Sequence, residues 1–154
     1  SKKDQAEHVM IVDLIRNDLG KICNFGTVET NDLFKVHSFK TIHHMITEVT
    51  GELKQKIEEK DIFKALFPGG SITGAPKQRS LEIIDELENY SRGVYTGTLG
   101  YISNNGDMNF NIGIRTLTIK GDKITYPVGG GIVWDSVSSE EREEALHKSK
   151  ILNI

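Results

Sequence analysis

Four acidic residues form two pairs, one near each end of the chain. Asp4 and Glu7 are three residues apart, as are Glu141 and Glu144, so each pair lies on one face if its segment is helical. Carboxylate oxygens that leave room for water are the ligands that Mg²⁺ prefers. A second interpretation is a capping box, because Asp4-x-x-Glu7 resembles that motif and Ser138-x-x-Glu141 has its standard form. Spacing alone leaves metal binding and helix capping both open.

Lys148 and a run of three glycines could bind an anion. Lys148 follows Glu144 by four residues, the favoured order for a helical ion pair, which contributes only about 0.3–0.5 kcal/mol when exposed. It could instead meet an anionic ligand that a metal also holds. Gly129, Gly130 and Gly131 follow a strand-like segment, and glycines there allow another group to approach the backbone closely. Their N–H groups could hold a carboxylate or phosphate, although a simple β-bulge fits equally well.

Other candidate residues are less distinctive by themselves. Arg115 lies in a segment predicted to be a strand, 108–119, and arginine suits bidentate carboxylate recognition, but a strand arginine is as often a surface residue. His44 lies in a predicted helix, 41–60, where one of two adjacent histidines is commonly just exposed. The glycine-rich stretch 69–77 lacks the order of a phosphate-binding loop, which argues against a nucleotide triphosphatase.

Composition excludes several classes of protein. The 154 residues carry a net charge of −3 with 27% charged residues, so no basic surface is predicted for nucleic acid. The sequence has no apolar run of about 20 residues that could span a membrane and no secretory signal. The single cysteine, Cys23, cannot form an internal disulfide, and no spacing resembles a zinc site. We therefore expect a cytoplasmic protein without nucleic-acid or membrane partners.

The predicted elements favour an α+β fold. A helix is expected from Asp4, as its N-cap, to Gly20, and a final helix from Ser138 or Ser139. Between them, Asn105-Gly106 is a strong hairpin signal between two strand-like segments. Helices followed by paired strands do not alternate regularly enough for a doubly wound parallel sheet. An α+β domain of sheets and helices is therefore expected.

Taken together, these motifs resemble the chorismate-binding family, which includes the first components of anthranilate synthase and aminodeoxychorismate synthase, isochorismate synthase and salicylate synthase. The similarity runs almost from end to end, and its motifs stand in the family's order. The matching stretches are 6–19 (AEHVMIVDLIRNDL), 70–77 (GSITGAPK), 114–116 (IRT), 129–133 (GGGIV), Glu141-x-x-Glu144 and Lys148.

The resemblance implies a role for each candidate residue. It implies Mg²⁺ as cofactor, with Glu7 and Glu144 as direct ligands, and Glu141 and Asp4 in support. Chorismate would be held by Tyr95, Arg115, Gly129, Gly130, Gly131 and Lys148. The residues with catalytic roles would be His44, Thr73 and Lys148, with His44 a general acid or hydrogen-bond donor near the departing hydroxyl.

The resemblance also implies a fold, a reaction and its partners. The chain would be part of the fold shared by the first components of anthranilate synthase and aminodeoxychorismate synthase, with antiparallel sheets and helices packed outside. Stretch 67–77 looks more like the aminodeoxychorismate synthase branch than the anthranilate synthase branch, which is the alternative. Chorismate would be aminated to 4-amino-4-deoxychorismate with ammonia from a glutamine amidotransferase subunit. Residues 1–154 would be the C-terminal part of a chorismate-binding domain, because the family's P-I-[KA]-G-T segment lies upstream of the matched region. The chain alone would then be poorly active, or a binding module for chorismate and Mg²⁺ that needs the N-terminal part of the same enzyme.

Overall fold

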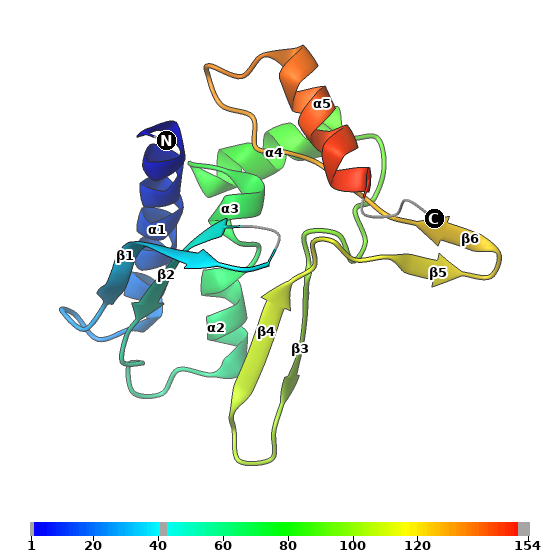
Figure 1. Ribbon diagram of the computed structural model, residues 1–154. Helices are drawn as coiled ribbons and strands as arrows, with labels where there is room; N and C mark the ends of the chain where they lie inside the picture. The colour runs from blue at the N-terminus through cyan, green and yellow to red at the C-terminus, as the bar shows by residue number, and fades with distance from the viewer. Residues whose placement is uncertain (1, 41–42, 151–154) are drawn as a thin grey trace. The chain divides into compact units, whose positions relative to one another are not determined.

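The computed structural model describes residues 2–40 and 43–150, with side chains from Gln5 onward. The chain divides into two compact units, Ser1–Ile83 and Ile84–Ile154. Both combine helices with strands, and every strand pair is an antiparallel hairpin (Figure 1). The α+β class with antiparallel sheets is therefore confirmed.

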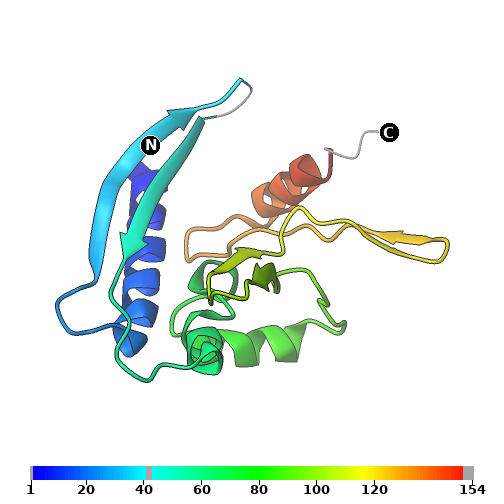
Figure 2. The same ribbon diagram turned by 90° about the horizontal axis from the view of Figure 1, so that it is seen from below.

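The first unit is built around a long helix and a hairpin. α1 (Lys2–Ile22) lies along β1 (Glu29–Ser38) and β2 (His43–Thr50), as Figure 2 shows. The expected helix is confirmed, but it extends two residues beyond Gly20, and it begins before Asp4, so Asp4 is not its N-cap. The side chain of Asp4 lies outside the described residues.

Three further helices follow the hairpin. They are α2 (Glu59–Leu66), α3 (Gly70–Thr73) and α4 (Lys77–Leu87), and both α2 and α3 contact α1. Ile22, Cys23 and Ala65 are buried between α1 and α2 and form the core of this unit. Gly70 brings α3 close to α1, because a Cβ there would lie 2.8 Å from Leu14 Cδ1.

The helix predicted over 41–60 is wrong, and His44 lies on a strand. Residues 43–50 form β2, and helix begins again only at Glu59; Thr41 and Ile42 lie outside the described residues. In β2 the half-buried residues are Met45, Thr47 and Val49, which alternate with exposed ones. This period of two, together with β-branched side chains, suits a strand with one covered face.

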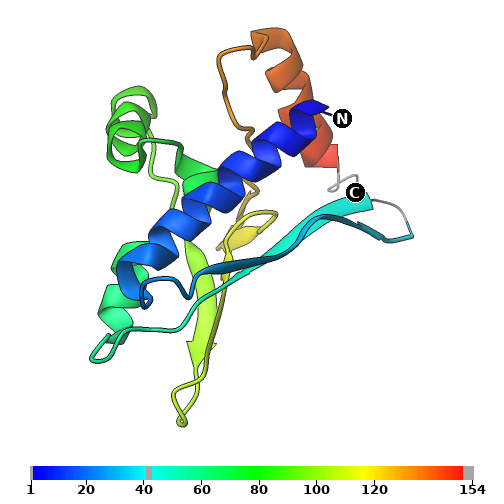
Figure 3. The same ribbon diagram turned by 90° about the vertical axis from the view of Figure 1, so that its left-hand side faces the viewer.

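The second unit carries two hairpins and the last helix (Figure 3). β3 (Thr98–Ile102) pairs with β4 (Met108–Ile112), and β5 (Thr118–Lys120) pairs with β6 (Lys123–Thr125). The Asn105-Gly106 turn is confirmed, with Gly106 at φ 90°. α5 (Ser138–Ser149) begins where the sequence predicts it.

The strand predicted over 108–119 is interrupted at Gly113. The segment 94–97 lies directly against this buried glycine, whose N–H donates to Gly97 O at 2.8 Å, and a Cβ there would lie 2.3 Å from Val94 O. The chain therefore leaves the β3–β4 ladder, and Arg115 stands at a bend with φ 53° rather than within a strand.

No helix in the described part of the chain has both the length and the apolar character needed to cross a membrane.

Candidate functional site

Glu141 in the first turn of α5 does not cap its own helix. Val137 is the N-cap and has no side-chain cap hydrogen bond, so the capping box Ser138-x-x-Glu141 is not formed. Instead Glu141 Oε1 accepts a hydrogen bond of 2.6 Å from Ser136 Oγ. Its second oxygen, Oε2, is buried and has no hydrogen-bond partner in the described part of the chain. A buried carboxylate oxygen without a donor is costly, so this oxygen is suited to bind a cation or a water.

Glu144 presents an oxygen to the same place. A Cβ built on Gly130 would lie 3.1 Å from Glu141 Oε2 and 3.6 Å from Glu144 Oε1. Glycine at 130 therefore leaves the space that two carboxylates face, and we call Glu141 and Glu144 the carboxylate pair. Two acidic side chains that converge on one point repel each other unless positive charge lies between or beside them.

Lys148 supplies one such charge and ties α5 to the glycine run. Its ammonium donates to Glu144 Oε1 and, at 3.0 Å, to the carbonyl of Gly129. The ion pair predicted from the i, i+4 spacing is therefore confirmed. It is more than a solvated surface pair, because the Lys148 side chain is 29% exposed and bridges two segments.

The Tyr95 hydroxyl lies close to the first glycine of the run, Gly129. A Cβ on Gly129 would lie 2.7 Å from the Tyr95 hydroxyl oxygen, so a larger residue here would displace that hydroxyl. A tyrosine phenol is protonated at neutral pH and can donate a hydrogen bond, and burial raises the pKa of Tyr95 further. None of the three glycines lies in a strand, so the β-bulge interpretation is wrong.

The segment that presents Tyr95 is held by an arginine–glutamate pair. Arg92 donates to both oxygens of Glu88, at 2.7 and 2.6 Å, and to Thr96 Oγ1 at 3.2 Å. Its guanidinium carbon lies 5.9 Å from the centre of the Tyr95 ring. The hydrogen bonds from Arg92 lower the pKa of Glu88, and the same bonds raise the pKa of Arg92.

The N–H groups of the glycine run are available to a ligand. Within the described residues, none of the N–H groups of Gly129, Gly130 and Gly131 donates a hydrogen bond. Two of these residues are exposed, and Gly129 is half-buried. Successive free N–H groups beside a lysine and a protonated phenol can hold a carboxylate. The structure thus brings together Tyr95, Gly129, Gly130, Glu141, Glu144 and Lys148.

Three other predicted residues belong to the first unit. Glu7 is half-buried on α1. His44 is exposed on β2, with its ring edge-on to Phe39 at 6.1 Å. Thr73 ends α3, and its hydroxyl donates to Gly69 O at 3.0 Å. Their roles toward chorismate stay predictions.

Arg115 and the metal also stay predictions. Arg115 is exposed and makes no hydrogen bond or ion pair within the described residues. No group of three or more His, Cys, Asp and Glu side chains that could hold a metal occurs among the described residues. The predicted ligands come from both units, with Glu7 in the first and the carboxylate pair in the second.

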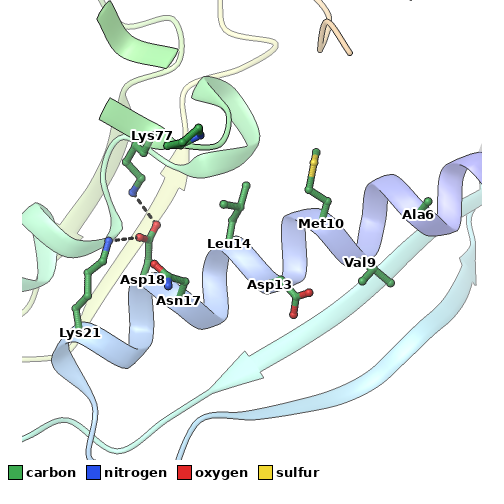
Figure 4. Close-up of a pocket in the computed structure, with 10 residues that line it drawn as sticks. Ala6, Val9, Met10, Asp13, Leu14, Asn17, Asp18, Lys21 and Lys77 are labelled. Carbon is green, nitrogen blue, oxygen red and sulfur yellow. Dashed lines mark hydrogen bonds and ion pairs between the residues drawn. The ribbon is translucent and has the colours of Figure 1, made fainter. Parts of the chain in front are cut away.

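A buried ion pair in the first unit was missed by the sequence reasoning. Figure 4 shows a pocket beside α1 in which the Asp18 carboxylate forms ion pairs with the ammonium groups of Lys21, at 2.7 Å, and Lys77, at 2.6 Å. The Asp18 side chain is only 7% exposed. Asp18 follows Leu14 by four residues on the face of α1 that meets α3. A charge on that face was the available signal, because buried acids are paired.

Comparisons with known proteins cover nearly the whole chain. The sequence pattern of the chorismate binding enzyme family matches residues 1–153. The chain is 47% identical over 148 residues to aminodeoxychorismate synthase component 1 of Escherichia coli (strain K12), covering 96% of the chain and 33% of that protein. It is 42% identical over 151 residues to anthranilate synthase component 1 of Aquifex aeolicus, covering 98% of the chain and 31% of that protein.

A solved structure agrees with the fold. The crystal structure of anthranilate synthase component I from Streptococcus pneumoniae matches with a TM-score of 0.91 and 40% identity, over 97% of this chain and 34% of that one. The chain thus spans about a third of the length of these relatives. With a family match over residues 1–153 and a matching fold, the chain belongs to the chorismate binding enzymes.

Proposed function

We propose that this chain supplies metal- and carboxylate-binding groups to an enzyme that aminates chorismate to 4-amino-4-deoxychorismate. The observation that carries the proposal is the convergence of Glu141 Oε2 and Glu144 Oε1 at Gly130, beside a glycine run whose N–H groups donate no hydrogen bond to the described residues. The 47% identity to an aminodeoxychorismate synthase component 1 supports the choice of product.

The donor set fits Mg²⁺. Glu7 and Glu144 would bind it directly, and Glu141 would support it through its buried Oε2, which has no partner in the described part of the chain. Oxygen ligands with space for waters suit this hard cation. When bound, Mg²⁺ supplies positive charge that neutralises a substrate carboxylate and orients the ring.

Residues of this chain would also bind the two carboxylates of chorismate, which is a dianion. The N–H groups of Gly129 and Gly131 would donate to the ring carboxylate, and the ammonium of Lys148 would add charge beside Gly129. Arg115 and the protonated phenol of Tyr95 would bind the carboxylate of the enolpyruvyl group. The proposed site therefore balances the negative charge of chorismate with fixed donors, which need no reorganisation as the reaction proceeds.

The reaction exchanges one group on the ring. The C4–O bond breaks, a C–N bond forms with ammonia, and the enolpyruvyl ether is retained. His44 would donate a proton or hydrogen bond to the departing hydroxyl, which leaves as water. Thr73 would line the same pocket. A glutamine amidotransferase partner would supply the ammonia.

Product analysis tests this proposal. The complete polypeptide that carries these residues is incubated with chorismate, an ammonium salt and Mg²⁺. Products are separated by chromatography, and pyruvate is measured by a coupled lactate dehydrogenase assay. We expect aminodeoxychorismate without pyruvate, and loss of the product with EDTA or Glu144→Gln.

The competing function is anthranilate synthesis. It is favoured by the 42% identity to one anthranilate synthase component 1 and by the TM-score of 0.91 to the structure of another. Forming anthranilate removes the enolpyruvyl group, so anthranilate and pyruvate in equal amounts would overturn the proposed product. Equal rates with and without EDTA would overturn the metal assignment.

A further inference from the structure

Ser136 lies in the turn that joins the glycine run to α5. Its N–H donates to Val133 O at 3.0 Å, and its hydroxyl oxygen accepts a hydrogen bond from Val133 N–H at 3.0 Å. The same hydroxyl donates to Glu141 Oε1 at 2.6 Å. A serine hydroxyl has one proton, and here the backbone occupies its acceptor side while its proton is directed to Glu141.

This hydrogen bond determines where the other Glu141 oxygen points. A glutamate in the first turn of a helix can reach back to the N-cap backbone, but Val137 receives no such cap. With Oε1 held by Ser136, Oε2 is buried without a partner in the described part of the chain and faces the space at Gly130. Glu144 Oε1 faces the same space.

We infer that Ser136 is a positioning residue for the cation site. It orients Glu141 so that Oε2 reaches the divalent cation or a water bound to it, and it does not contact the cation itself. This inference rests on the proposed function. Residues that hydrogen-bond to metal ligands fix the orientation of those ligands, and their loss typically lowers metal affinity by about 10–100-fold.

Metal titration of the complete polypeptide tests this role. Binding of Mg²⁺ and of Ca²⁺ is measured by calorimetry with chorismate present, for the unmodified protein, Ser136→Ala and Ser136→Thr. Ser139→Ala is the matched control, because Ser139 is a nearby exposed serine in the first turn of α5. We expect Ser136→Ala to lower Mg²⁺ affinity by about 10–100-fold, Ser136→Thr to restore it to within a few-fold, and Ser139→Ala to leave it unchanged.

The ratio of the two metal affinities separates positioning from general damage. Mg²⁺ demands near-octahedral geometry, whereas Ca²⁺ accepts flexible coordination. A misoriented Glu141 should therefore weaken Mg²⁺ more than Ca²⁺, while a partly unfolded site would weaken both equally. If the alanine variant does not fold, Ser136→Cys gives the same measurement, because a thiol is a weaker donor, and intermediate Mg²⁺ affinity is expected.

The outcomes distinguish this inference from the proposed function. If Glu141→Gln weakens Mg²⁺ binding but Ser136→Ala does not, the role of Ser136 is wrong and the metal site stands. An equal loss for both metals would also overturn the positioning role. If the unmodified protein binds no Mg²⁺, or Glu144→Gln binds it equally well, the proposed metal site itself fails.

Discussion

Glycine at position 130 is favoured by the side chains that face it rather than by its backbone conformation. Its φ is not positive, so alanine is compatible with the backbone there. A Cβ would nevertheless lie 3.1 Å from Glu141 Oε2 and 3.6 Å from Glu144 Oε1. The first distance is tighter than an ordinary contact, so the Glu141 carboxylate would have to shift by a few tenths of an ångström, whereas the second is an ordinary contact.

Replacing Gly130 by alanine should therefore affect the metal more than the fold. We expect Gly130→Ala to lower Mg²⁺ affinity by about tenfold or more, because ligand geometry at this cation is strict, while the thermal unfolding midpoint changes little. Calorimetric titration and a thermal melt measure the two effects. Gly131→Ala is the matched control, since nothing lies within 4 Å of its added Cβ. Equal Mg²⁺ affinities for the two variants would contradict this account of Gly130.

Among the helices, α1 is joined to the start of α4 by the buried Asp18–Lys77 pair. Lys77 Nζ also lies 3.4 Å from Ala65 O at the end of α2, so one ammonium links three helices. Asp18 keeps a second partner, Lys21, on its own helix. Removing Lys77 would leave a buried carboxylate with one exposed lysine.

The variant Lys77→Met should destabilise the protein by about 2–3 kcal/mol, somewhat less than the usual loss for a broken buried pair because Lys21 remains. Urea unfolding of the complete polypeptide measures this difference. Arg16→Met removes an exposed pair with Asp13 on the same helix and should cost no more than about 0.5 kcal/mol. Similar losses for the two variants would show that Lys77 is an ordinary surface lysine.

The Arg92–Glu88 ion pair near the end of α4 makes a pH-dependent contribution to the stability of the protein. Arg92 lowers the pKa of Glu88, so the stabilisation is fully present above the ordinary glutamate pKa of about 4.3 and is lost as pH falls through the lower folded-state pKa. We expect Arg92→Met to be less stable than the unmodified protein at pH 7, with the difference shrinking toward about pH 3. Urea unfolding at both pH values measures it.

The exposed pair Arg79–Glu82 on α4 provides the control. Its side chains are 55% and 47% exposed, so Arg79→Met should change stability little at either pH. A gap between Arg92→Met and the unmodified protein that is as large at pH 3 as at pH 7 would show that Arg92 acts through packing rather than through charge.

Local patterns predicted several of these elements, and tertiary contacts explain where prediction failed. Helical spacing of apolar residues predicted α1, the Asn105-Gly106 turn signal predicted the β3–β4 hairpin, and the start of α5 was predicted correctly. The strand at 43–50 is short, and its alternation is hidden within the longer helix-like pattern of 41–60. The bend at Arg115 follows from the contact of segment 94–97 with Gly113, which is not visible in the local sequence.

In the candidate site, too, some residues could be predicted from the sequence and others are known only from the fold. Glu141, Glu144 and Lys148 could be selected from spacing and family resemblance, and the glycine run from its position after a strand. The role of Ser136 could not be predicted, because a glutamate three residues after Ser138 predicts a capping box. Only the geometry of the turn shows that Glu141 accepts a hydrogen bond from Ser136 instead. Asp18 and Lys77 are 59 residues apart, so their pairing is a property of the fold.

For the molecule as a whole, the second unit offers little apolar core of its own. The buried hydrophobic residues of the described chain all lie in the first unit: Val12, Ile22, Cys23 and Ala65. The hairpins of the second unit expose large apolar side chains, among them Leu99, Tyr101, Ile102, Ile119 and Ile124. Exposed apolar side chains on hairpins favour association with further protein.

The 154 residues alone should therefore show little or no turnover of chorismate. We expect them to bind a hydrophobic dye strongly, whereas the polypeptide at the full length of the relatives binds it weakly and is active. Dye fluorescence and the product assay, run on both proteins at equal concentration, measure the difference. Robust aminodeoxychorismate formation by the 154 residues alone would refute this expectation.

The central claim of the proposed function is that Glu7 and Glu144 would bind one divalent cation next to Gly130. Anomalous diffraction from crystals of the complete polypeptide, grown with chorismate and with Mn²⁺ in place of Mg²⁺, locates that cation directly. The account predicts one anomalous peak about 2.0–2.3 Å from carboxylate oxygens of both residues, absent from crystals of Glu144→Gln. A peak bound by other residues, or Glu7 and Glu144 carboxylates too far apart to share an ion, would contradict it.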